Sequence, residues 1–227
     1  MNASTLSRWA GMAAMASGIL FIGIQVIHPS DELSSVSTDR WVIVHILGVA
    51  MCLFGLLGVA GIYTRQVSAA GWTGLAGYLL MTLFYTLSLG FQFVEAFVSP
   101  ALTTNSPAFV EGILGIASGD GSEMDLGALP TVYSITGGMY VLGGLLFGVA
   151  TFRAGILPRR AAALLAVGTL LPILGAAVPH PWDRAFAAPM GLALAWLGYA
   201  LWTERREYAA TPVTASDNAL LQHAGAE

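Results

Sequence analysis

The sequence predicts an all-α membrane protein, a polytopic transmembrane helical bundle of about six helices. Of its 227 residues, 56% are hydrophobic and only 10% are charged, a composition far from that of a soluble domain. The apolar residues form long continuous runs, and most charged residues stand between the runs. Runs of this length cross a bilayer as helices, because a strand of a membrane barrel has only about ten residues.

Six runs are each near the roughly 20 residues that a helix needs to cross the hydrocarbon core of a bilayer. We place the spans at residues 9–27, 41–63, 72–98, 130–152, 160–178 and 185–203. Together they form one bundle over residues 1–203, and residues 204–227 have the composition of a disordered cytoplasmic tail. The length of the first run favours a retained helix over a cleaved signal peptide.

Short connections predict which helices are neighbours. Residues 64–71 join the second and third runs, and residues 153–159, with helix breakers at Gly155 and Pro158, join the fourth and fifth. Because short connections join antiparallel helices, we expect both pairs to pack as hairpins.

The longest connection, residues 99–129, contains a further helix signal. Ser106 followed by Pro107 is typical of a helix start, and the next residues repeat apolar side chains at helical spacing. We expect a short helix over residues 106–117 at the outer mouth of the bundle, either as an interfacial helix or as a lid.

Charge predicts the orientation of the bundle. All the basic residues are arginines, and the spans place seven of them on one face: Arg8, Arg65, Arg153, Arg159, Arg160, Arg205 and Arg206. The positive-inside rule then predicts cytoplasmic N- and C-termini, in a bacterial inner membrane. These cations are too dispersed for a nucleic-acid surface, and the single Cys52 can form no disulfide within one chain.

The third span carries a polar stripe that indicates a functional site. Tyr85, Ser88, Gln92 and Glu95 are spaced three, four and three residues apart, so they share one helical face in an otherwise apolar run. Ionisable groups inside a membrane are costly and usually face the bundle interior. The alternative is that Glu95 reaches the outer headgroup region.

Histidines stand near the outer ends of three other spans. His45 lies one turn after Trp41, an interfacial anchor, while His28 and His180 lie beside prolines, with Asp183 close to His180. A single histidine at a helix end is usually a cap, but three at one depth near a carboxylate indicate a site. Tyr133 and Tyr140 on the fourth span, with Phe91 on the third, add aromatic side chains at the same end.

Short patterns in the chain resemble those of a large group of small bacterial integral membrane proteins: His28–Pro29, Trp41 with His45, 95–100 and 153–159. The size, the several spans and the isolated intramembrane acid are also similar to membrane-bound terpene cyclases of meroterpenoid and indole-sesquiterpenoid pathways. That resemblance implies protonation of an alkene or epoxide on a prenyl chain, followed by carbocation ring closure. No catalytic residue of that family is carried over, and its fungal members have an additional span.

The leading hypothesis is a membrane enzyme, an isomerase of terpene-cyclase type, acting on an isoprenoid or lipid-like substrate from the bilayer without a cofactor. Glu95 would donate the proton, His45 and Gln92 would orient it, and Asp183 is a second acid. The residues expected to contact substrate are Trp41, Tyr85, Ser88, Phe91, Gln92, Tyr133, Tyr140 and His180.

Two alternatives belong to other functional classes. The first is a metal-dependent hydrolase or redox protein in which His28, His45 and His180 supply nitrogen ligands, with Glu95 or Asp183 as carboxylate. The second is a non-enzymatic binding, transport or accessory protein. Transporters usually place charges at the midplane and show internal repeats, whereas these polar residues gather on the outer side.

Overall fold

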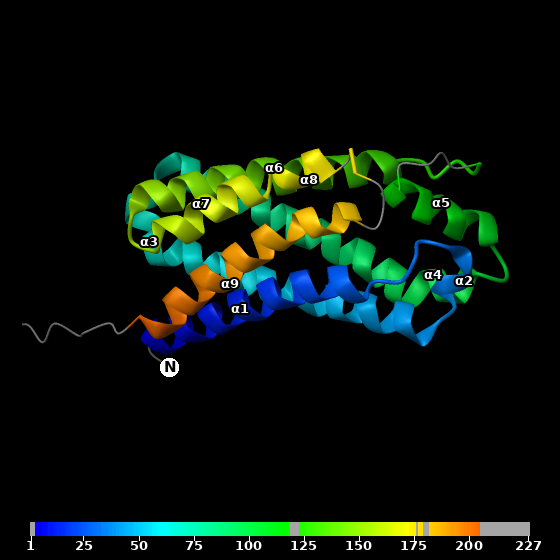
Figure 1. Cartoon of the computed structure of the whole chain (residues 1–227), viewed down its shortest axis with the longest axis horizontal. Helices are drawn as coiled ribbons and strands as arrows, with labels where there is room; N and C mark the ends of the chain where they lie inside the picture. The colour runs from blue at the N-terminus through cyan, green and yellow to red at the C-terminus, as the bar shows by residue number, and fades with distance from the viewer. Residues whose placement is uncertain (1–2, 119–122, 176, 179–181, 205–227) are drawn as a thin grey trace, which may run out of the picture.

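The computed structural model describes residues 3–118, 123–175, 177–178 and 182–204. Helices run along the long axis of an elongated bundle, and the described chain starts and finishes at the same end (Figure 1). No strand occurs in the described residues, so the all-α prediction is confirmed. The helices are α1 (Ala3–Ile27), α2 (Leu33–Val36), α3 (Asp39–Phe93), the π-helical η1 (Val94–Val98), α4 (Ser99–Leu102), α5 (Pro107–Ser118), α6 (Leu129–Ala154), α7 (Arg159–Gly168), α8 (Leu171–Gly175), the 3₁₀ helix η2 (Trp182–Ala187) and α9 (Ala188–Thr203).

Helices able to cross a membrane are present, as the sequence predicts. Within the described residues, four helical segments are long and apolar enough to do so: Thr5–Ile27, Asp39–Leu102, Leu129–Ala154 and Arg184–Thr203. The sequence predicts about six. The two numbers differ for two reasons. The predicted spans 41–63 and 72–98 fall within one of the four segments, and the predicted span 160–178 is interrupted.

The predicted spans 41–63 and 72–98 lie within one helical element that reverses direction. The backbone leaves helical geometry at Gln66 and at Gly71, where φ is +58°, a conformation that favours glycine. Beyond this turn the second half of α3 returns along the first, and the rings of Tyr63 and Tyr78 stack with centroids 4.5 Å apart. The expected hairpin is therefore present, with its two helices joined at this turn.

The predicted span 160–178 is interrupted after about half its length. α7 ends at Gly168, and the hydroxyl of Thr169 donates to the carbonyl of Leu165 at 3.2 Å, which competes with the backbone for that acceptor. Pro172 has no N–H to continue the helical pattern. Neither α7, with ten residues, nor α8, with five, is long enough alone to cross a bilayer core.

Close contacts between backbones hold the long helices of the bundle together. α1 packs against both α9 and α3, and α3 packs against α6. A Cβ atom on Gly191 of α9 would lie 2.7 Å from the carbonyl oxygen of Gly18 on α1, so this crossing requires glycine. The hydroxyl of Ser17 donates to the carbonyl of Met51 at 2.9 Å, which connects α1 to the first half of α3.

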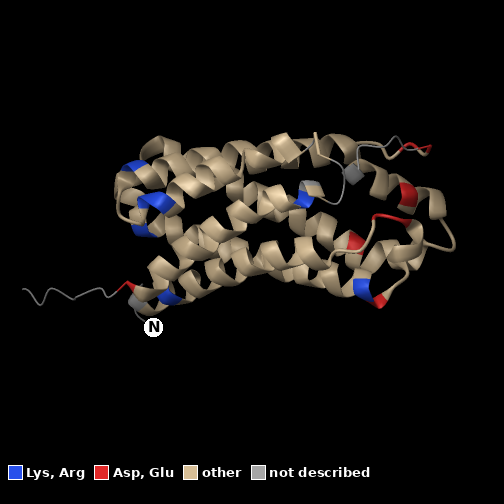
Figure 2. Cartoon of the chain, viewed as in Figure 1, with Lys and Arg blue, Asp and Glu red and all other residues tan. Residues whose placement is uncertain are grey.

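The two ends of the bundle carry different charges. Figure 2 shows most arginines at the end with the chain termini and most acidic residues at the opposite end. At the arginine-rich end, Arg65 donates to Glu204 through Nε at 2.6 Å. Glu204, the first residue of the predicted tail, is thus held against the turn of α3, whereas 205–227 lie outside the described residues.

Candidate functional site

Glu95 lies on an irregular turn of helix that leaves its backbone carbonyl without the usual partner. The N–H of Ser99 bonds the carbonyl of Val94 in the wider π-helical pattern, and the following Pro100 has no N–H. The indole Nε1–H of Trp41 donates to the Glu95 carbonyl instead, at 2.9 Å. Trp41 is 1% exposed, and this bond joins the start of α3 to η1.

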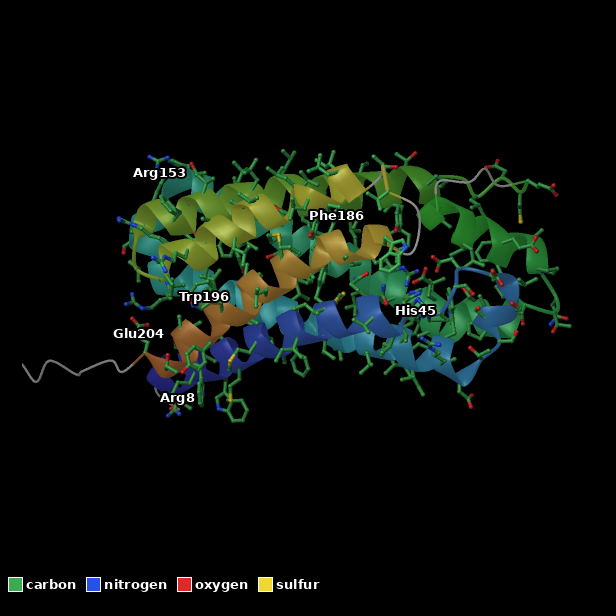
Figure 3. All side chains as sticks on the ribbon, viewed as in Figure 1. Arg8, His45, Arg153, Phe186, Trp196 and Glu204 are labelled. Atoms are coloured by element: carbon green, nitrogen blue, oxygen red, sulfur yellow. The ribbon has the colours of Figure 1, made fainter. Side chains whose placement is uncertain are left out.

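His45 connects the same two residues through its ring. Its Nδ1 lies 2.8 Å from the carbonyl oxygen of Trp41, and its Nε2 lies 3.0 Å from Oε2 of Glu95. The sequence predicts Glu95 within hydrogen-bond reach of His45, and the structure confirms this geometry. His45 lies well away from the end of the bundle marked by Arg8 (Figure 3).

These contacts determine how many protons the pair holds. A backbone carbonyl only accepts, so Nδ1 of His45 must carry a hydrogen. Nε2 and Oε2 are then both acceptors unless one proton lies between them, either on His45 as imidazolium or on Glu95 as carboxylic acid. The side chain of His45 is 2% exposed and that of Glu95 17%, so the pair is open on the glutamate side, where Glu95 lines a cavity.

A cavity of about 270 Å³ lies beside Glu95. Most of its wall is apolar or aromatic, and it is formed by α1, α3, η1, α6, α8 and the 3₁₀ helix η2 before α9. Its lining residues are Phe21, Phe84, Ser88, Phe91, Gln92, Glu95, Tyr133, Thr136, Gly137, Tyr140, Pro172 and Ala187. Of the predicted substrate contacts, this cavity therefore brings together Ser88, Phe91, Gln92, Tyr133 and Tyr140.

Trp41 and Tyr85 were expected beside the substrate, and the structure places both away from this cavity. Tyr85 is fully buried, with its ring packed against Gly55 and Phe84. Among the residues of the predicted stripe, Tyr85 is the one furthest along the helix from Glu95. The stripe is thus divided between a packed core contact and a cavity wall.

α5 covers Trp41. Val110 and Leu114 of α5 form a buried cluster with Trp41 and with Val36 of α2. The predicted apolar face of this helix is confirmed, because Val110, Ile113 and Leu114 are all buried. The helix packs against Trp41, and none of its side chains that the structure describes lines the cavity.

His28 stands next to His45 without a hydrogen bond between the two rings. Their centroids are 5.1 Å apart in an edge-to-face arrangement, and Trp41 lies 5.6 Å from His28 on another side. Nδ1 of His28 donates to the carbonyl of Pro29 at 2.8 Å and lies 3.7 Å from Asp31, which accepts a 2.9 Å bond from Arg184.

Burial lowers the pKa of His28 below its ordinary value. The Pro29 carbonyl opposes this shift, whereas the positive charge of Arg184 adds to it. His28 is therefore uncharged at neutral pH, immediately beside the proton-sharing pair.

Other predicted residues cannot be placed in the site. His180 lies outside the described residues, and so does the side chain of Asp183, whose backbone belongs to η2. Among the residues that the structure describes, no three of His, Cys, Asp and Glu are grouped so that they could hold a metal ion.

Sequence reasoning missed part of the cavity wall. Phe21 on α1 and Phe84 on α3 flank Tyr140, whose ring centroid lies 6.3 Å and 5.1 Å from theirs. Aromatic residues in an apolar run resemble any lipid-facing side chain, so no sequence signal distinguishes them. No role was assigned to Asp31 and Arg184 from the sequence either, although their opposite charges were a usable signal for the contact that they form.

Comparison with known proteins adds no family assignment to this geometry. No family model, no curated protein sequence and no solved structure matches the chain.

Proposed function

We propose that this chain is an integral membrane enzyme that isomerises an isoprenoid or similar lipid-like substrate by proton transfer, as a terpene cyclase does. The observation that carries the proposal is the 3.0 Å contact between Nε2 of His45 and Oε2 of Glu95, with Glu95 forming part of the wall of a largely apolar cavity. General acid catalysis needs a proton donor positioned within hydrogen-bond reach of the substrate, and a proton held by this pair would supply it.

The reaction proceeds without a second reactant. Glu95 donates its proton to an epoxide oxygen or alkene carbon of the prenyl chain, and the resulting electron deficiency draws the electron pair of a neighbouring double bond into a new carbon–carbon bond. The final carbocation loses a proton to the Glu95 carboxylate, which restores the acid. His45, with hydrogen on Nδ1, offers the Nε2 lone pair that orients the carboxylic acid.

The cavity suits a slender substrate. Phe91 and Tyr133 contact each other with centroids 5.3 Å apart, and Phe84 and Tyr140 form the next such pair, seven residues further along each helix. Seven helical residues span about 10 Å, so the aromatic rings line a channel of about that length below Glu95. Ring faces stabilise positive charge, which supports cyclisation through cations.

We propose in addition that the bundle crosses a bacterial inner membrane six times, with both termini in the cytoplasm. The arginine-rich end shared by the termini supports this orientation, because basic residues are retained on the cytoplasmic side. Glu95 and the cavity then lie toward the outer leaflet, and the substrate enters from the bilayer.

The test compares wild-type membranes with the Glu95→Gln variant on prenylated and epoxidised substrates, using liquid chromatography coupled to mass spectrometry to separate a cyclised product of unchanged mass from the substrate. We expect a loss of rate of at least about 100-fold, the usual contribution of a positioned acid. Glu111→Gln, at an exposed glutamate of α5, is the matched control and should retain full activity. Full activity of Glu95→Gln would remove Glu95 from the mechanism.

A further inference from the structure

A second, larger hollow lies in the half of the bundle that contains the termini. It measures about 740 Å³ and runs between α1 and the first half of α3, on the surface of the bundle. The residues that line this groove are Leu6, Ser7, Trp9, Ala10, Met12, Ala13, Ala16, Phe54, Leu57, Ala60, Gly61 and Thr64. None of them lines the cavity beside Glu95, so the two hollows are separate sites.

Differences in side-chain size create the groove. Its floor consists of small residues where the helices touch, since a Cβ atom on Gly61 would collide with the side chain of Ala10. Its walls are large side chains that project outward, with Trp9 62% and Leu57 59% exposed. An apolar surface of this shape is stable in a bilayer when hydrocarbon fills it.

The length of the groove matches one leaflet. It extends from Leu6 to Ala16 on α1 and from Phe54 to Thr64 on α3, a distance of ten helical steps in each case. Ten helical residues rise about 15 Å, which is half of the roughly 30 Å hydrocarbon core. The hydrocarbon chains of a single lipid have this depth, whereas a helix of another protein would continue across both leaflets.

A positively charged residue adjoins the lining residues of the groove in the chain, at the end of the bundle that contains the termini. Arg8 lies between the lining residues Ser7 and Trp9, at the end of the bundle that also carries Arg153 (Figure 3). Its guanidinium lies 6.0 Å from the ring centroid of Trp202, a neutral partner. Among the described residues, no carboxylate forms an ion pair with Arg8, so its charge is available to an anion.

From the depth, the apolar walls and this charge, we propose that the groove binds one anionic phospholipid of the leaflet at the arginine-rich end. The hydrocarbon chains lie between α1 and α3, and the phosphate contacts Arg8. The site is independent of the proposed enzymatic activity.

Native mass spectrometry of the purified chain tests this site. The protein is titrated with an equimolar mixture of phosphatidylglycerol and phosphatidylcholine that carry the same acyl chains. We expect one retained lipid per chain and a preference for phosphatidylglycerol of about fivefold, the effect of one arginine near an anionic headgroup. Glycerol phosphate, which has the headgroup charge without chains, should not be retained.

Two kinds of variant separate the contributions of charge and shape. Arg8→Gln should remove the preference between the lipids, whereas Arg159→Gln should keep it, because Arg159 also stands over an aromatic ring, 5.9 Å from that of Phe152, but away from the groove. Ala60→Phe or Ala16→Phe should fill the groove and abolish retention of both lipids. Ile19→Phe, at a position that is 64% exposed outside the groove, should have no effect.

Three outcomes would overturn the proposal. Equal lipid retention by the filled variants would show adventitious binding, and retention of glycerol phosphate at the affinity of the lipid would indicate a phosphate site. A dimer that dissociates in Ala60→Phe, in place of a lipid adduct, would assign the groove to a second copy of the chain. Melting temperatures of all variants identify any that are unfolded. If either Ala60→Phe or Ala16→Phe is unfolded, lipid retention is measured on the other.

Discussion

The indole N–H of Trp41 donates to the backbone carbonyl of Glu95 over a distance of 2.9 Å, between residues 54 positions apart in the chain. The bond compensates for Pro100, which has no N–H to offer that carbonyl. His45 bonds both the Trp41 carbonyl and the Glu95 side chain, so the three residues hold each other in one geometry. A carboxyl group placed in this way has little freedom to turn away from the cavity.

Trp41→Phe should destabilise the fold by about 1–3 kcal/mol, because it keeps an aromatic ring but leaves the partly buried Glu95 carbonyl without this donor. Equilibrium unfolding in detergent micelles measures the free energy. Trp72→Phe is the control, since Trp72 is 85% exposed. Equal stability of the two variants would show that the indole bond contributes nothing.

His45 should never carry its only proton on Nε2, because Nδ1 donates to the Trp41 carbonyl. Nitrogen-15 solid-state NMR of histidine-labelled protein in lipid distinguishes the tautomers. We expect either imidazolium or the neutral Nδ1–H form in wild type. In Glu95→Gln, where an amide N–H replaces the shared proton, we expect only the neutral Nδ1–H form. A neutral Nε2–H signal from His45 would contradict the geometry of the pair.

His28 should make the protein less stable in acid. Its pKa is lowered in the fold from the ordinary 6.5, mainly by burial, so the unfolded chain binds its proton first as pH falls. The stability contributed by neutral His28 is complete above about pH 6.5 and is lost below it, by at most about 1.4 kcal/mol per pH unit.

His28→Gln should remove this part of the pH dependence. The free energy of unfolding, measured from pH 7.5 to 5, should have a smaller slope in the variant than in wild type. The groups that face His28, namely Asp31, His45 and Arg184, remain in both proteins, so the difference between slopes isolates His28. Parallel curves would mean that His28 keeps its ordinary pKa in the fold.

Gly71→Ala should destabilise the turn of α3 by about 1–2 kcal/mol, because a residue with a Cβ is strained at φ +58°. Nothing lies within 4 Å of the added atom, so the effect comes from the backbone alone. Gly90→Ala has equally open surroundings but stands in regular helix, where alanine stabilises by up to about 1 kcal/mol. The two substitutions should therefore change the free energy of unfolding in opposite directions.

The local sequence was enough to locate most helices, since apolar run length and helix breakers act through near neighbours. The predicted span 130–152 lies within α6, and α5 has the predicted apolar face. The interruption at Thr169 was not predicted. Neither Thr169 nor Pro172, the second residue of α8, breaks the apolar character of the run from which the span was predicted. The spacing that put Ser88, Gln92 and Glu95 on one face also correctly predicted a shared environment.

Residue types and their spacing along the chain are enough to establish the helical class, the separation of charge between the two ends and the polar face of the second half of α3. Each of these depends on residue type and on the 3.6-residue period of a helix. Three relationships are visible only in the folded structure: Trp41 donates a hydrogen bond to the Glu95 carbonyl, Tyr85 packs in the core and His28 lies beside His45. Such relationships depend on which helices pack together and on how each helix is rotated about its axis. Close contacts such as that between Gly18 and Gly191 set both. These residues are too far apart in the chain for any local sequence pattern to predict their contact.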